Sequence, residues 1–187
     1  MSQITTQRDG AVLIATIANP PHGYMDAETE SELETVLDEV DTDATVRAVV
    51  LTGGLSDVFV RHYDVGVLET LGRDLAARDL EFDTSRAVPE SPYHVCLRRI
   101  ATMPKAFVAA INGTAMGGGF ELALACDIRL AKDGPYWLGL PEINIGLLPG
   151  AGGTQRLARL IGEGRALELI LQGRTVGPAE AAKWGLV

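Results

Sequence analysis

Residues 113–127, which read GTAMGGGFELALACD, join two segments of different predicted structure. Three glycines, Gly117 to Gly119, separate a strand-like run at 106–111 (AFVAAI) from a helix-like run at 120–126 (FELALAC). Because glycine loses more conformational freedom on ordering than any other residue, its use at this junction needs a reason. One reason is tight packing of the helix against the strand. The other is a helix start whose exposed N–H groups hold an anion, or an oxygen that becomes anionic during a reaction.

The segments before this junction alternate between strand and helix patterns. Residues 11–19 (AVLIATIAN) are predicted to form a strand, and the continuous apolar run at 46–54 (VRAVVLTGG) is typical of a strand buried on both faces. Between them, Asp26 is a candidate N-cap for a helix with an apolar stripe at Leu33, Val36, Leu37 and Val40. Strands alternating with helices predict an α/β fold with parallel strands.

The rest of the chain continues this alternation. The polar, proline-containing segment 81–92 is predicted to be an exposed loop. Apolar spacing predicts helices around 67–75 and 93–103, a strand at 127–133, and further helices within 151–161, 164–172 and 177–186. With no internal repeat and no composition break, residues 1–187 are expected to form a single domain.

Composition and charge exclude several classes of function. The net charge of −9, without a cluster of Lys and Arg, argues against nucleic-acid binding. No apolar run approaches the ~20 residues that span a membrane, and the N-terminus lacks a secretory pattern. Cys96 and Cys126 have neither metal-ligand spacing nor the number needed for a disulfide framework. We therefore expect a cytoplasmic protein with no metal site.

Two carboxylates lie in unusually apolar surroundings. Glu121 follows the glycines at the start of an almost wholly apolar helix, and Glu142 lies in GLPEINIGLLPGAGG before another glycine-rich helix start. A buried carboxylate is costly without a partner, and its pKa is raised when it occurs. Two such groups fit paired general acid–base chemistry. The alternatives are that Glu121 is a helix-start charge facing water and that Glu142 is a structural partner for a backbone N–H group.

Several segments, in order, resemble the crotonase (enoyl-CoA hydratase/isomerase) superfamily. They are NPP at 19–21, VRAVVLTG at 46–53, NGTAMGGGFELALACDIRLA at 112–131 and PEINIGLLPGAGGTQRL at 141–157. The resemblance implies a crotonase-like spiral of repeated β-β-α units, usually assembled as a homotrimer or a dimer of trimers. It also implies acyl-CoA substrates, with no cofactor beyond the coenzyme A of the substrate itself.

The resemblance also implies roles for particular residues. The backbone N–H groups of Tyr63 and Gly118 would form an oxyanion hole for the thioester oxygen. Glu121 and Glu142 would be the acid and base that hydrate a 2-enoyl-CoA to a 3-hydroxyacyl-CoA. Asp64 and Gly150 match superfamily positions that contribute to binding substrate or water. Because isomerases of the superfamily can work with one carboxylate, the presence of two favours hydration.

The segment FVRHYD, at 59–64, departs from the superfamily pattern, which resembles F-S-A-G-A-D. His62 stands where a glycine is usual, so a positive φ there would strain the loop. Arg61 is a candidate binder of a CoA phosphate or an acidic acyl group, and His62 a candidate extra acid or base, unless both face solvent. The ring of Tyr63 is expected to crowd or line the acyl pocket. Because some superfamily members use histidine to cleave C–C bonds in β-diketones, C–C hydrolysis is one alternative function.

Superfamily members normally continue for several dozen residues beyond WGLV at 184–187. The C-terminal helices that cover the acyl site and contribute to subunit contacts are therefore expected to be absent or truncated. Two further functions remain as alternatives to hydration. One is an enoyl-CoA isomerase, and the other is a non-catalytic acyl-CoA-binding or assembly paralogue.

Overall fold

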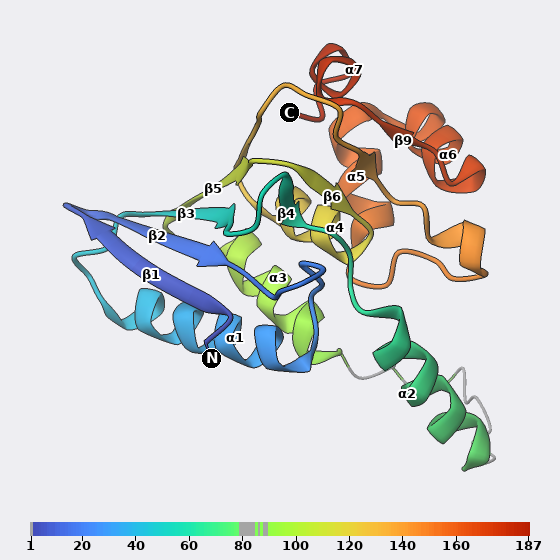
Figure 1. The fold of residues 1–187 in the computed structure, drawn as a ribbon, viewed down its shortest axis with the longest axis horizontal. Helices are drawn as coiled ribbons and strands as arrows, with labels where there is room; N and C mark the ends of the chain where they lie inside the picture. Colours follow the sequence, from blue (N-terminus) through green and yellow to red (C-terminus); the bar gives the residue numbers. More distant parts are fainter. Residues whose placement is uncertain (1, 79–84, 86, 88–89) are drawn as a thin grey trace.

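The strands of the protein form two sheets (Figure 1) in a computed structural model that describes residues 2–78, 85, 87 and 90–187. The larger sheet has the order β1 (Ile4–Asp9), β2 (Val12–Ile17), β3 (Ala48–Gly53), β5 (Ala106–Ile111) and β7 (Ile128–Ala131). The smaller sheet has the order β4 (Val58–Val60), β6 (Thr114–Met116), β8 (Leu138–Gly139) and β9 (Thr175–Val176). Pairing is parallel except at β1–β2 and β8–β9.

Successive turns of the chain place one strand in each sheet and then a helix. The three turns are β3–β4–α2 (Val65–Ala77), β5–β6–α4 (Gly118–Ala125), and β7–β8 followed by the 3₁₀ helix η1 (Glu142–Ile145) and α5 (Gly153–Ile161). Equivalent strands of neighbouring turns pair in parallel, so the turns stack as a spiral. The predicted spiral of β-β-α units is confirmed.

Helices α1 (Ala27–Thr42) and α3 (Pro92–Thr102) lie together against one face of the larger sheet (Figure 1). Asp26 caps α1, because its side chain accepts a hydrogen bond from the Thr29 N–H at 2.9 Å. The predicted stripe of α1 is buried, at Leu33, Val36, Leu37 and Val40. The local prediction of this helix is therefore confirmed.

Strands β2, β3 and β5 of the larger sheet bury alternate residues, so the prediction that 46–54 is buried on both faces is wrong. In β3, Val49 and Leu51 are fully buried, whereas Val50 and Thr52 are only half-buried. The buried side chains join the core beneath α1 and α3. The apolar run therefore forms a strand with only one fully buried face. Val50, on the other face, keeps part of its surface exposed although its side chain is apolar.

Helix α2 projects away from the body of the molecule, whereas α6 (Glu163–Gln172) and α7 (Pro178–Lys183) lie near α5 and β9 (Figure 1). The predicted loop at 81–92 falls largely outside the described residues, with Ser91 capping α3 at its end. No helix in the described ranges is long and apolar enough to cross a membrane.

Candidate functional site

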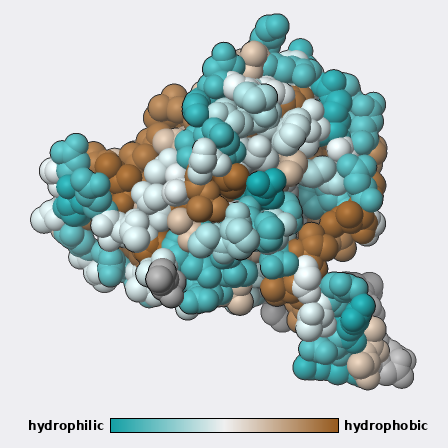
Figure 2. All heavy atoms as spheres, in the orientation of Figure 1, coloured by the Kyte–Doolittle hydropathy of each residue, from teal (hydrophilic) through white to brown (hydrophobic). Residues whose placement is uncertain are grey.

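A pocket of about 720 Å³ opens between the start of α4, the segment 62–63, η1 and the inner side of α2. Apolar atoms gather where α2 leaves the body and beside η1 (Figure 2). The polar side chains of its wall are those of Glu30, His62, Tyr63, Ser91, Tyr93, Glu121, Glu142 and Asn144, and the backbone of Gly117, Gly118 and Gly150 also lines it. The pocket thus brings together both predicted acids and both predicted amide donors.

Glu121 is held inside the core by the start of another helix. All eight residues of α4 are buried, and Glu121 itself is only 3% exposed. Its Oε1 accepts hydrogen bonds from the backbone N–H groups of Ala151 at 2.8 Å and Gly153 at 2.7 Å. Burial raises the pKa of the Glu121 carboxyl, and the two N–H donors oppose that rise by stabilising its charged form. The predicted buried carboxylate is thus fixed in position by two directed hydrogen bonds.

The three glycines have different structural reasons. Gly117 adopts φ 49°, a conformation that favours glycine. A Cβ on Gly119 would lie 1.9 Å from the Val60 carbonyl oxygen, so the strand could not approach α4 this closely. A Cβ on Gly118 would lie 3.0 Å from the Tyr63 Cβ, in the wall of the pocket. The packing explanation therefore holds for Gly119, while Gly118 leaves its backbone accessible to a ligand.

Glu142 begins η1 on the opposite wall and lacks a comparable cradle. Its Oε2 is buried and has no hydrogen-bond partner within the described part of the chain. Burial, with a smaller repulsion from Glu121, raises the pKa of Glu142 to about 7. A Cβ on Gly117 would lie 3.3 Å from Glu142 Oε1, so this carboxyl faces the start of α4. The two acids share one pocket but have different surroundings.

The amides of Tyr63 and Gly118 are close neighbours. Tyr63 forms an isolated bridge with Met25, in which its flanking residues make the hydrogen bonds: Met25 N–H donates to the His62 carbonyl, and Asp64 N–H donates to the Met25 carbonyl. This pairing leaves the Tyr63 N–H free, and the Gly118 N–H begins α4. Neither donates a hydrogen bond within residues 2–78, 85, 87 and 90–187. The Tyr63 nitrogen is 3.3 Å from the point that a Gly118 Cβ would occupy.

The other predicted residues are placed unequally. His62 lines the pocket without a positive φ, so the expected strain is absent there, and its Nδ1 lies 2.7 Å from the Tyr63 carbonyl oxygen. Arg61 is not part of the pocket wall, and its Nε donates to the His22 carbonyl at 2.9 Å. Asp64 caps α2 by accepting from the Gly66 N–H at 2.8 Å. Gly150 lies on the exposed rim.

Glu30 and Tyr93 are among the pocket residues that were not predicted. Glu30 lies three residues before Leu33, so it extends the apolar stripe of α1 by one turn, and a carboxylate on that stripe was a signal. Tyr93 likewise opens the buried stripe of α3, which continues at Cys96, Leu97 and Ile100. Its hydroxyl donates to the Gly118 carbonyl at 2.6 Å. Spacing showed that these residues face inward, but it did not show what they meet.

Comparison with known proteins completes this description. A family model described as enoyl-CoA hydratase/isomerase matches residues 7–187. The chain belongs to this family. Among solved structures, an enoyl-CoA hydratase from Bacillus anthracis superposes with a TM-score of 0.86 at 33% identity, covering 99% of this chain and 68% of that one. The fold and the family predicted from the signature segments are therefore confirmed.

Relatives of this enoyl-CoA hydratase/isomerase family member differ in length. A probable enoyl-CoA hydratase from Bacillus subtilis is 38% identical over 192 residues, covering 100% of this chain and 68% of the relative. The fatty acid oxidation complex subunit alpha of Shewanella halifaxensis is 37% identical, covering 97% of this chain and 25% of the relative. The chain thus spans about a quarter of the longer relatives and about two thirds of the shorter ones.

Proposed function

We propose that the protein hydrates 2-enoyl-CoA thioesters to 3-hydroxyacyl-CoA. The observation that carries this proposal is the convergence, on one pocket, of two desolvated carboxyls and two backbone N–H groups that donate no hydrogen bond within the described residues. Hydration needs these two functions together: donors that stabilise charge at the thioester oxygen, and an acid–base pair that moves two protons.

The amides of Tyr63 and Gly118 would hold the thioester oxygen. As water adds to the β-carbon, electrons of the C=C bond move towards the carbonyl and that oxygen becomes enolate-like. Two fixed N–H donors stabilise it without reorganising, and the dipole of α4 adds to the effect at Gly118. Catalysis by this route requires donors that are unoccupied before substrate binds, as these two are among the described residues.

The surroundings of the two acids favour different roles. Glu121 accepts two N–H bonds, which favour its charged form, so we assign it as the base that takes a proton from water. Glu142, with a pKa of about 7 and an unpartnered oxygen, is assigned as the acid that delivers a proton to the α-carbon. The water oxygen bonds to the β-carbon, and afterwards Glu121 holds one proton more and Glu142 one fewer. Gly150, on the rim, is proposed to help hold the attacking water.

Asp64 is proposed to act on substrate binding indirectly. Its Oδ1 is occupied by the cap of α2, so the carboxylate holds the turn that follows Tyr63. Asp64 would thereby orient the Tyr63 amide.

An enoyl-CoA isomerase is the second candidate, and the unequal acids support it. A single carboxyl that titrates near neutrality, as Glu142 does, can take a proton from one carbon and return it to another. C–C hydrolysis would need His62, which lines the pocket next to Tyr63.

A substrate panel tests these functions. Purified protein would be assayed with 2-enoyl-CoA for loss of the conjugated enoyl absorbance, with 3-enoyl-CoA for its gain, and with a cyclic β-diketone for ring opening. Hydration of the 2-enoyl ester as the fastest reaction supports the proposal, and a faster reaction on either other substrate contradicts it. Calorimetric binding of an acyl-CoA without turnover on any substrate would instead identify a non-catalytic binding module.

We further propose a cytoplasmic homotrimer, or dimer of trimers, that needs only the coenzyme A of its substrate. The buried, unpaired thiols of Cys96 and Cys126 support a reducing compartment. Light scattering after size exclusion measures the assembly, and a monomer at micromolar concentration would contradict this proposal.

A further inference from the structure

The pocket contains a third carboxyl, contributed by Glu30 of α1. Its position on the buried stripe of α1 turns it towards the pocket rather than to solvent, and it is half-buried. Burial raises the pKa of this carboxyl, and repulsion from Glu34 adds to that rise. A carboxyl that bears this desolvation, with no cation beside it in the described part of the chain, is a candidate for contact with a ligand.

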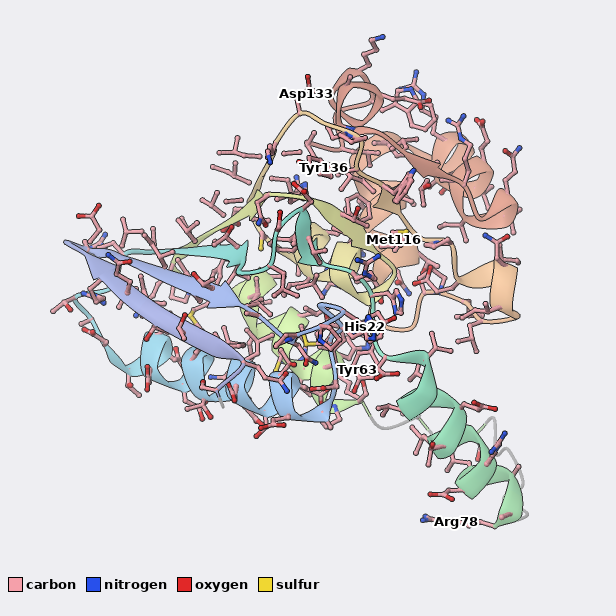
Figure 3. The ribbon with its side chains drawn as sticks, viewed as in Figure 1. His22, Tyr63, Arg78, Met116, Asp133 and Tyr136 are labelled. Carbon is pink, nitrogen blue, oxygen red and sulfur yellow. The ribbon has the colours of Figure 1, made fainter. Side chains whose placement is uncertain are left out.

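Glu30 is joined to the proposed thioester site by Tyr63. The Tyr63 hydroxyl donates to Glu30 Oε2 at 3.2 Å, while the amide of the same residue faces Gly118. Figure 3 shows Tyr63 close to the start of α2, on the side of the molecule where α1 begins. The backbone amide of Tyr63 would thus bind the thioester oxygen, while the hydroxyl at the end of the same side chain forms a polar pair with Glu30.

Tyr93 makes this wall continuous. Its ring lies against the Tyr63 ring with centroids 5.5 Å apart, and its hydroxyl is bonded to the Gly118 carbonyl at 2.6 Å. Tyr93 is buried, so both rings are held by packing as well as by hydrogen bonds. An acyl chain that leaves the thioester along this wall would meet the Tyr63 hydroxyl and the Glu30 carboxyl at its end.

The chemistry of the pair selects its guest. Tyr63 already donates its only hydroxyl proton to Glu30, so the lone pairs that remain on the two groups are acceptors. No Lys or Arg side chain lines the pocket among the described residues, which disfavours an acyl group with a carboxylate of its own. A plain alkyl end would displace water from Glu30 without replacing its hydrogen bonds. Leaving a buried acceptor without a hydrogen bond costs binding free energy. The complementary group is a hydrogen-bond donor.

We propose that Glu30 and the Tyr63 hydroxyl form a specificity site that selects acyl groups ending in a hydrogen-bond donor, of which a hydroxyl is the simplest. This inference rests on the proposed function only in placing the thioester at the amides of Tyr63 and Gly118. A chain of about five carbons with a terminal hydroxyl has roughly the reach of a tyrosine side chain, at about 1.5 Å per bond.

Binding of unreactive thioesters tests the inference independently of catalysis. The probes are 5-hydroxypentanoyl-CoA and hexanoyl-CoA, which have equal numbers of chain atoms and differ by a hydroxyl in place of a methyl. By calorimetry we expect the native protein to bind the hydroxylated thioester about tenfold more tightly. Equal affinity, tighter binding of hexanoyl-CoA, or binding of neither thioester overturns the inference.

Substitutions then assign the preference to the pair. Glu30→Leu is expected to abolish or reverse the preference, and Tyr63→Phe, which keeps the backbone amide, to reduce it. Glu39→Leu removes an exposed carboxylate from the same helix and is expected to leave the preference unchanged. A thermal melt checks folding of each variant. If Glu30→Leu does not fold, Tyr63→Phe decides, and a preference that survives this substitution in full overturns the inference.

Turnover separates the two proposals. The native protein would be assayed with 5-hydroxypent-2-enoyl-CoA and hex-2-enoyl-CoA. Selective binding without hydration of either ester would refute the proposed function and leave the specificity site standing. Hydration of both at equal kcat/KM would refute the specificity site alone.

Discussion

Helices α4 and α2 occupy equivalent places in successive β-β-α turns, and both contribute to the same pocket, yet they are packed in opposite ways. All eight residues of α4 are buried, whereas none of the 13 residues of α2 is. The polar groups proposed for catalysis are held by α4 and its neighbours, while α2 offers exposed leucines at the rim. The pocket therefore joins a wall fixed by core packing to an exposed apolar wall.

The largest expected contrast is in stability. Leu122 of α4 is fully buried, and Leu122→Ala is expected to lower the free energy of unfolding by about 2–5 kcal/mol through lost burial and a cavity. Leu71 of α2 is 53% exposed, so Leu71→Ala is expected to change it by less than about 0.5 kcal/mol. Urea unfolding measures both, and equal losses would show that α2 packs more firmly than its exposure indicates.

The two acids test whether both members of the proposed acid–base pair are needed for chemistry. Glu121→Gln and Glu142→Gln are each expected to lower hydratase turnover at least ~10²-fold, because each removes one member of the acid–base pair. Both variants should keep the fold. In Glu121→Gln, the side-chain amide oxygen can still accept hydrogen bonds from the Ala151 and Gly153 N–H groups. Turnover and circular dichroism are the measurements. Near-native turnover in either folded variant would remove that residue from the mechanism.

Gly119 and Gly150 differ in how closely other backbone atoms approach them. Gly119→Ala would drive a methyl group into the Val60 carbonyl, 1.9 Å away, and is expected to lower the free energy of unfolding by about 1–3 kcal/mol or more. Around Gly150 the nearest atom to an added Cβ is the Leu148 carbonyl oxygen at 3.9 Å, so Gly150→Ala should be tolerated. Denaturant unfolding of the pair decides the point, and a silent Gly119→Ala would contradict the close strand-to-helix approach.

The smallest expected effect is a pH dependence at Glu142. With a pKa of about 7, Glu142 loses its proton as pH rises through neutrality, so kcat/KM is expected to fall by up to tenfold per pH unit above about 7. A rate that rises through pH 7 would assign Glu142 as the base instead.

The raised pKa of Glu142 also predicts how the free energy of unfolding changes with pH. The folded pKa of Glu142 is raised above its ordinary value of 4.5, so its contribution is fully present below about 4.5 and is lost as pH rises through about 7. The native protein should therefore lose stability relative to Glu142→Gln across this window. A constant difference would mean that the carboxyl titrates normally in the folded state.

Much of the site could be predicted because its groups lie in local patterns. Glu121 follows the glycines and opens an apolar helix, and Glu142 interrupts an apolar, glycine-rich stretch, so each was recognisable as a carboxyl in the wrong surroundings. Glu30 was missed although it carried a similar signal, because it extends a stripe whose later positions are all aliphatic. The exposure of α2 could not be predicted, since its leucine spacing is that of any amphipathic helix.

Local patterns in the amino-acid sequence predicted most of the helices, strands β2, β3, β5 and β7 of the larger sheet, and the family, because periodicity and glycine placement act over a few residues. The short strands of the smaller sheet, the partial exposure of β3 and the exposure of α2 were not predicted. Only the tertiary structure decided which distant groups meet: the Tyr63 amide with Gly118, the Tyr63 hydroxyl with Glu30, and the Ala151 and Gly153 amides with Glu121. A periodic pattern records that a face is buried but carries no information about its partner. The partner is settled when the β-β-α turns stack and the core closes around them.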